Sequence, residues 1–226
     1  MGRPLLLQDE MTRACVQPVV VWANRVSTDR RVDGLDELVL RCAAQGQNFI
    51  PTATRDAVRQ MLRHGRYKPS GRGKPASEFL LQAALNGVFP KVNGPVDVNN
   101  AVSLEAGLPA SIFDADVAGD RLFVRRGLPG ESYVFNPSGQ SIDLEDLLVV
   151  CRWMAGRWAP CGNPVKDAME TKIRPETGRV VAVLYVPRVL GDEIAACWGA
   201  RFRDVLAETC AAEDSGFALA SEAGGD

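Results

Sequence analysis

The amino-acid sequence predicts an α+β fold with mixed α/β layers. Segments with helical periodicity fill residues 35–106, short strand-like runs follow within residues 112–186, and a long amphipathic segment covers residues 192–211. A regular doubly wound sheet would instead alternate strands and helices along the whole chain. At 226 residues the chain can form one domain with a substantial core, or alternatively two small ones.

The first half contains one expected strand and four expected helices. Residues 18–23 (PVVVWA) are apolar and largely β-branched, which predicts a buried strand. Apolar residues recur at helical spacing in four later segments, and a glycine follows three of them as a stop signal. These segments are residues 35–44, 54–64, 77–86 and 97–106. The intervening residues 67–75, rich in Gly, Pro, Lys and Arg, are expected to form a loop.

The second half is predicted to be strand-rich until a closing helix. Short strand candidates, separated by Gly, Pro and Asp, are residues 112–113, 122–124, 132–135 and 147–150. Residues 180–186 (VVAVLYV) form the clearest buried strand, and residues 192–211 form a long amphipathic helix. Residues 213–226 are small, acidic and Gly-rich, so we expect a single domain over residues 1–212 and a disordered tail.

Charge and cysteine usage restrict the compartment and the partners. The net charge of −2 predicts no global attraction to nucleic acid or to a membrane surface, so any such contact needs a local patch. No apolar run reaches the length of about 18 residues that a membrane span needs. The N-terminal apolar run is too short for a secretory signal, and the six cysteines form no Cys-x-x-Cys pair. We therefore expect reduced, mostly buried thiols and a cytoplasmic protein.

A metal centre and a His-based catalytic triad are not expected. The chain has one histidine, His64, and its position near the end of a predicted helix is favourable on dipole grounds alone. The stretch GRGKPAS at residues 71–77 lacks the glycine spacing of a phosphate-binding loop. The sequence thus indicates no metal and no cofactor.

A cationic segment runs from the second helix into the following loop. Arg55, Arg59 and Arg63 are spaced by four and share one helix face. The loop continues the positive charge with Arg66, Lys68, Arg72 and Lys74. These side chains could contact phosphate groups, but a solvated helix face with a flexible loop explains the same pattern and is the commoner case.

The densest polar cluster contains Asn93, Asp97, Asn99 and Asn100 within eight positions. Asp97 as a helix N-cap and Asn93-Gly94 as a turn would explain two of these residues. Those roles leave Asn99 and Asn100 unexplained in the first helical turn, where Asn is a mediocre helix former. A pocket that reads small polar groups is the alternative. A second polar stretch, residues 161–171, is explained by a turn and local caps.

The stretch VDVNNAVSLEAGLPASIFDAD at residues 96–116, followed by Arg125-Arg126 and Gly130-Glu131, resembles a known family. It is similar to the B3/B4 tRNA-binding and editing domain of the phenylalanyl-tRNA synthetase beta subunit. The N-terminal half is similar to free-standing members of that family, so the resemblance covers residues 15–190. It implies a B3/B4-type domain with a central mixed sheet flanked by helices.

The resemblance also implies a site. In the synthetase this domain hydrolyses tyrosine wrongly attached to the phenylalanine tRNA. The pocket Asn of the family corresponds to Asn100, whereas its His and Glu positions are Ser111 and Val183 here. Hydrolysis could still proceed through a positioned water and oxyanion donors, with Asn100 and Ser111 as the catalytic candidates. The remaining pocket candidates are Asn93, Asp97, Asn99, Gly162, Asn163 and Val183, and the phosphate-binding candidates are Arg66, Lys68, Arg72 and Lys74.

The expected partner is tRNA or aminoacyl-tRNA. One implied activity is the hydrolysis of mischarged aminoacyl-tRNA in trans by an aminoacyl-tRNA deacylase, which is an ester hydrolase. The alternative is a non-catalytic module that binds tRNA, an amino acid or a small metabolite in a reused editing pocket. A basic path from residues 55–74 to the pocket would favour tRNA, and an isolated closed pocket would favour a small ligand.

Overall fold

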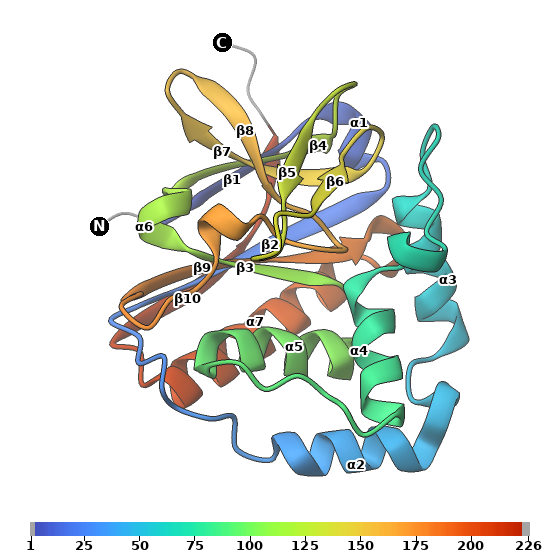
Figure 1. The fold of residues 1–226 in the computed structure, drawn as a ribbon, viewed down its shortest axis with the longest axis vertical. Coiled ribbons are helices and arrows are strands. Elements are labelled where there is room, and N and C mark those ends of the chain that lie inside the picture. Colours follow the sequence, from blue (N-terminus) through green and yellow to red (C-terminus); the bar gives the residue numbers. More distant parts are fainter. Residues whose placement is uncertain (1–2, 223–226) are drawn as a thin grey trace.

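The structure is a computed structural model that describes residues 3–222 (Figure 1). Its helices are α1 (Glu10–Arg13), α2 (Leu35–Gln45), α3 (Thr52–Leu62), α4 (Ala76–Leu85), α5 (Gly94–Ala106), α6 (Ala115–Ala118) and α7 (Asp192–Cys210). Its strands are β1 (Leu5–Gln8), β2 (Val16–Asn24), β3 (Ala110–Asp114), β4 (Arg121–Arg126), β5 (Ser132–Val134), β6 (Ser141–Asp143), β7 (Leu148–Met154), β8 (Arg157–Gly162), β9 (Arg179–Pro187), β10 (Asp214–Leu219) and β11 (Ser221–Glu222). The predicted α+β class is confirmed.

The centre of the molecule is a four-stranded antiparallel sheet with the order β10-β2-β9-β3. Residues 16–21 of β2 are all buried, because helices cover one face of the sheet and a second sheet covers the other. Burial on both faces explains why β2 and β9 are continuous apolar runs rather than alternating ones. Strand β3 lies at the edge of this sheet and leaves one side of its backbone free for other partners.

The second large sheet is mixed and has the order β11-β1-β4-β7-β8. Strand β1 pairs in parallel with β4 and β11, whereas β4, β7 and β8 are antiparallel neighbours. Leu122 and Val150 of this sheet share one hydrophobic cluster with Val19 and Val183 of the central sheet, so the two sheets pack face to face. Strands β5 and β6 form a separate hairpin.

Helices form the remaining layer, below the central sheet in the view of Figure 1. Helix α7 contacts β2 and β10, and α5 contacts β3 and α7. Helices α2 and α4 pack outside α5 through a second cluster that includes Leu38, Leu81 and Leu104. This arrangement places the N-terminal end of α5, the start of α4 and the edge strand β3 around one region of the molecule.

The predicted elements are present, but the predicted C-terminal boundary is wrong. Residues Asp214–Leu219 form β10, which pairs with β2 in the central sheet from Asp214 opposite Asn24 to Leu219 opposite Val19. Phe217 packs against the core cluster, and Gly216 is needed because a Cβ there would overlap the ring of Trp22. The acidic, Gly-rich composition gives no indication of β10, because this strand is stabilised by pairing with β2. Residues 223–226 of the expected tail lie outside the described residues.

All six cysteines are unpaired, and four of them are buried, as expected: Cys42, Cys151, Cys161 and Cys210. In the part of the chain that the structure describes, no helix combines the length and hydropathy needed to cross a membrane.

Candidate functional site

A cavity of about 580 Å³ lies between α4, the N-terminal part of α5, the edge strand β3 and the loop after β8. One part of its lining is apolar and includes Phe79, Val96 and Ile112. Its polar lining residues are Arg72, Asn93, Asn99, Asn100, Asn163, Lys166, Asp167 and Lys172. An apolar wall combined with a few convergent polar groups is the usual composition of a small-molecule site.

Helix α5 begins earlier than the sequence pattern suggests. Asn93 is its N-cap, and the Asn93 Oδ1 accepts a hydrogen bond from the Val96 N–H at 3.1 Å. Pro95 fits the first turn because the missing N–H would have no helical partner there. The helix cap is therefore Asn93 and not Asp97, and Asn93 also lines the cavity.

Asp97 lies inside the first turn of α5, and the prediction that it lines the pocket is wrong. Its side chain is fully buried and points to neighbouring segments of the protein. Its Oδ2 accepts from Arg31 Nη1 at 2.9 Å, and its Oδ1 accepts from the Val92 N–H at 2.6 Å. Asp97 thus holds the chain before α2 and the chain before α5 together.

Asn99 and Asn100 both line the cavity. Asn99 is only 7% exposed, and its Oδ1 is buried without a hydrogen-bond partner. Its Nδ2 donates to Asn100 Oδ1 at 3.4 Å. Within residues 3–222, Asn100 Nδ2 donates no hydrogen bond. The Asn100 amide is therefore the group on α5 that is free to donate to a ligand.

Asn163 lines the cavity, but its side chain is committed to the loop that follows β8. Asn163 Oδ1 accepts from the N–H groups of Val165 and Lys166, at 2.8 and 2.9 Å. Its Nδ2 donates to the Tyr133 hydroxyl, which in turn donates to the Lys166 carbonyl at 2.7 Å. These bonds fix the backbone that carries Lys166 and Asp167 at the cavity wall.

Asp167 is the cavity residue that sequence reasoning missed. Its Oδ2 accepts from the Ile112 N–H at 3.3 Å, on the free side of the edge strand β3. Its Oδ1 is buried without a hydrogen-bond partner. Burial raises the pKa of this carboxyl to about 7, and the hydrogen bond from the Ile112 backbone N–H offsets only part of that rise. A carboxyl that titrates near neutrality in a cavity is a candidate acid or base. The available sequence signal was an acid just after the Gly162-Asn163-Pro164 turn.

Ser111 and Val183 were expected in the pocket, but neither side chain lines this cavity. Both are fully buried and lie opposite each other on β3 and β9. Side chains alternate along a strand, and Ala110 and Ile112 are the β3 residues that face the cavity. The Ser111 Oγ lies 2.9 Å from the Tyr185 hydroxyl and donates to the Asn163 carbonyl at 3.3 Å. Ser111 supports the loop from behind.

Gly162 is buried next to the cavity but does not line it, in contrast to the prediction. A Cβ at this position would lie 2.7 Å from Asp167 Oδ1 and 2.5 Å from Phe113 Cε1. The absence of a side chain allows Phe113 and Asp167 to pack against the Gly162 backbone. Gly162 therefore leaves room for the Asp167 carboxyl.

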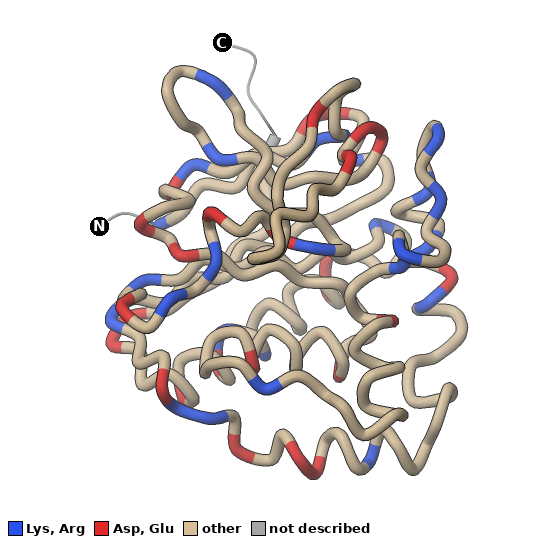
Figure 2. Tube along the Cα trace, viewed as in Figure 1, with Lys and Arg blue, Asp and Glu red and all other residues tan. Residues whose placement is uncertain are grey.

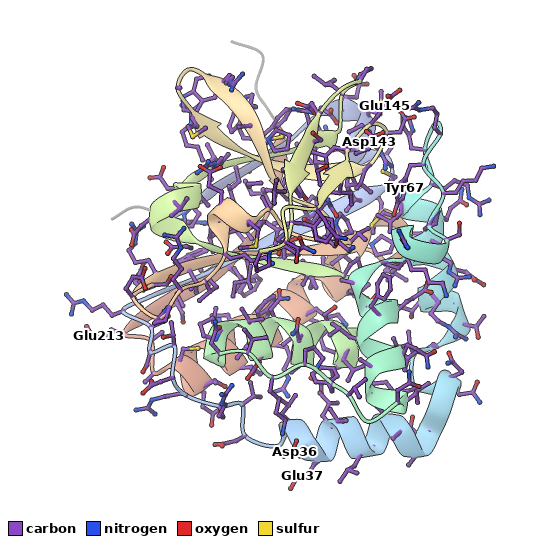
Figure 3. The ribbon with its side chains drawn as sticks, viewed as in Figure 1. Asp36, Glu37, Tyr67, Asp143, Glu145 and Glu213 are labelled. Carbon is purple, nitrogen blue, oxygen red and sulfur yellow. The ribbon has the colours of Figure 1, made fainter. Side chains whose placement is uncertain are left out.

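The predicted phosphate-binding residues differ in their surroundings. Figure 2 shows Lys and Arg along the segment between α3 and α4. Arg72 lines the cavity, and the Tyr67 hydroxyl holds its loop by donating to the Gly73 carbonyl. Arg66 instead forms ion pairs with Glu145 and with Asp143, the latter at 3.8 Å. Both acids are labelled in Figure 3; Asp143 is the last residue of β6, and Glu145 follows it.

Lys68 and Lys74 are exposed and make no ion pair within the described residues. Arg59 on α3 is bound to Glu78 of α4 by two hydrogen bonds, at 2.6 and 2.8 Å. From this loop Arg72 therefore brings positive charge to the cavity wall, while Arg59 and Arg66 are held by carboxylates.

A groove of about 840 Å³ lies beside the cavity and shares Arg72 and Lys166 with it. Tyr67 and Phe135 contribute aromatic rings to this groove, and Lys166 Nζ lies 3.9 Å from the centre of the Phe135 ring. In the described part of the chain, no group of His, Cys, Asp and Glu side chains is arranged to hold a metal ion.

The sequence of this chain is similar to one family of known proteins. Residues 71–188 match the family model of the B3/4 domain. The phenylalanine–tRNA ligase beta subunit of Onion yellows phytoplasma (strain OY-M) is 25% identical over 122 residues, which cover 53% of this chain and 14% of that protein. A crystal structure of an N-terminal fragment of the phenylalanyl-tRNA synthetase beta subunit from Pyrococcus horikoshii aligns with a TM-score of 0.47 and 10% identity, and covers 96% of this chain and 50% of the fragment. The chain thus spans a small part of the curated relative.

Proposed function

The chain belongs to the B3/4 domain family, and from this premise we propose that it binds the aminoacylated 3′ end of tRNA and hydrolyses the aminoacyl ester. The observation that carries the proposal is the meeting of two features at one cavity. The Asn100 amide, which is free to donate, and the Asp167 carboxyl, whose pKa is raised to about 7, line its wall. Arg72 from the basic loop lines the same cavity. The amide and carboxyl suit ester chemistry, and the arginine suits a phosphate backbone.

The lining divides naturally between the two parts of such a substrate. The apolar wall with Phe79, Val96 and Ile112 would receive the amino-acid side chain. Arg72 and Lys166, which border both the cavity and the adjacent groove, would contact the terminal phosphates. The rings of Tyr67 and Phe135 in the groove offer surfaces for base stacking, which tolerates any sequence.

The proposed reaction uses water as the nucleophile. Ionised Asp167 takes a proton from the water as its oxygen attacks the ester carbonyl carbon. Asn100 Nδ2 donates to the carbonyl oxygen as negative charge develops on it. The C–O bond to the ribose then breaks, and the proton passes from Asp167 to the leaving ribose oxygen. The products are a free amino acid and a tRNA with a free terminal hydroxyl.

The test is deacylation of a panel of matched and mismatched aminoacyl-tRNAs by the wild type and by Asn100→Ala. The exposed residue Asn86, at the C-cap of α4, provides the control variant Asn86→Ala, which removes an amide of the same kind outside the cavity. We expect turnover of one or a few species by the wild type and the control, and a loss of about 100-fold in Asn100→Ala. Turnover that is equal in both variants would contradict the role of Asn100, and no turnover by any protein would contradict hydrolysis.

A second candidate function is the binding of a free amino acid or small metabolite without hydrolysis. It is favoured by the burial of Ser111 and Val183, which leaves the family's His and Glu positions out of contact with the cavity. Calorimetric titration with free amino acids separates the two. Micromolar binding of a free amino acid together with no deacylation would support this candidate.

A further inference from the structure

A second cavity, of about 330 Å³, lies at the C-terminal end of α3 and shares no lining residue with the candidate site. Its lining includes three arginines and the single histidine of the chain: Arg63, His64, Arg126 and Arg188. Within the described residues, no Asp or Glu belongs to its lining. The function proposed above makes no use of this cavity.

Arg126 is the buried member of this group and is only 8% exposed. Its Nη2 donates to the Met61 carbonyl at 2.8 Å and to Cys15 Sγ at 3.3 Å, and its Nη1 donates to the Leu62 carbonyl at 3.2 Å. Its Nε–H is buried without a partner. Within the described residues, Arg126 forms no ion pair with a carboxylate.

Burial of a guanidinium ion without a counter-charge is costly. The carbonyls of Met61 and Leu62 belong to the last turn of α3, where the helix dipole supplies a partial negative charge. That partial negative charge is smaller than the full positive charge of Arg126, so part of the Arg126 charge stays uncompensated. An anion in the cavity would complete the compensation.

The other basic side chains lie at more accessible positions around the same space. Arg63 directly follows α3 and is exposed, and His64 comes next in the chain. Arg188 follows β9 and donates to Asp192 Oδ1 at 2.9 Å and to Gln17 Oε1. Asp192 therefore neutralises part of the charge of Arg188. The net positive charge around the cavity comes mainly from Arg63 and Arg126.

We propose that this second cavity binds a phosphate group, either as a free anion or as part of an RNA backbone. Guanidinium groups match the geometry of phosphate oxygens and keep their charge at all physiological pH values. The proposal is independent of ester hydrolysis at the candidate site, because the two cavities share no residue.

The test compares the wild type with the double variant Arg63→Gln/Arg188→Gln. This variant leaves Arg126, which supports α3, in place. The control is Arg157→Gln, since Arg157 is an exposed arginine at the start of β8 and lines neither cavity. Two probes are titrated into each protein at low salt: inorganic phosphate by calorimetry and a 12-nucleotide single-stranded RNA by fluorescence anisotropy. Thermal unfolding of each variant verifies that it is folded.

We expect the double variant to lose at least about tenfold in affinity for one of the probes, while the control changes little. A loss for inorganic phosphate identifies a free anion as the ligand, and a loss for RNA alone identifies a phosphodiester. Equal affinities of the double variant and the control for both probes would overturn the proposal. Aminoacyl-tRNA hydrolysis is measured in parallel, so a failure of the catalytic proposal is seen separately.

Discussion

The substitution Asp167→Asn tests whether the carboxyl in the candidate site is held in an unfavourable environment. Asn has nearly the same shape, and its side-chain oxygen can still accept from the Ile112 N–H. The substitution removes the charge that burial opposes. If the surroundings of Asp167 serve function at a cost in stability, the variant is more stable than the wild type above neutral pH.

The magnitude follows from the pKa of Asp167, which burial raises from 3.8 to about 7. The folded state therefore keeps a proton that the unfolded chain loses, and the stability of the wild type falls as the pH rises from 3.8 to about 7. The full loss of unfolding free energy over this pH range is about 4 kcal/mol, at 1.36 kcal/mol per pH unit. Most of it, about 3 kcal/mol, develops between pH 5 and pH 8.

The assay is urea unfolding of both proteins at pH 5 and at pH 8. All other titrating groups are common to the two proteins, so the pH dependence of the difference in unfolding free energy reports on Asp167. We expect the variant to gain about 3 kcal/mol relative to the wild type between the two pH values. A difference that stays constant would show that Asp167 titrates normally, and would also remove it as the proposed base.

Three further perturbations test the site and the fold. In Gly162→Ala, the new methyl group overlaps Phe113 and Asp167, so we expect a loss of about 1–3 kcal/mol in urea unfolding, and an unchanged midpoint would contradict the close packing. In Arg72→Gln, we expect weaker tRNA binding and a salt dependence reduced by about one phosphate contact, with Arg157→Gln as the matched control, and identical salt slopes would exclude Arg72 from the interface. Truncation after Glu213 removes β10 and leaves one edge of β2 unpaired, so we expect loss of cooperative thermal unfolding, whereas a sharp transition near the wild-type temperature would show that β10 is dispensable.

Local sequence patterns predicted most of the fold because the main elements are long and strongly periodic. The helices at residues 35–45 and 192–210 and the buried strand β9 lie within two residues of their expected bounds. Strand β10 was missed because its residues, DSGFAL, carry little apolar signal of their own. Its stability depends on pairing with β2, which is distant in sequence and invisible to a local pattern.

The candidate site was only partly predictable for a related reason. Asn99 and Asn100 stood out because Asn is a mediocre helix former, and both line the cavity from the second turn of α5. Ser111 does not line the cavity because a resemblance in sequence gives a position on a strand but not the face toward which the side chain points. Asp167 was missed because its altered pKa arises from burial behind the loop that Asn163 organises.

The position of β2 between β9 and β10 has a consequence for how the chain reaches its native state. Asn24 of β2 bonds to Arg179 and Asp214, which lie 155 and 190 positions along the chain. Closing loops of this length costs chain entropy before any contact compensates for it, and such long-range pairing makes folding slow. We expect β2 to remain without its partners during synthesis until both distant strands have emerged. In that interval its apolar surface is open to aggregation or to a chaperone, so the strand that stabilises the finished sheet is also its main folding liability.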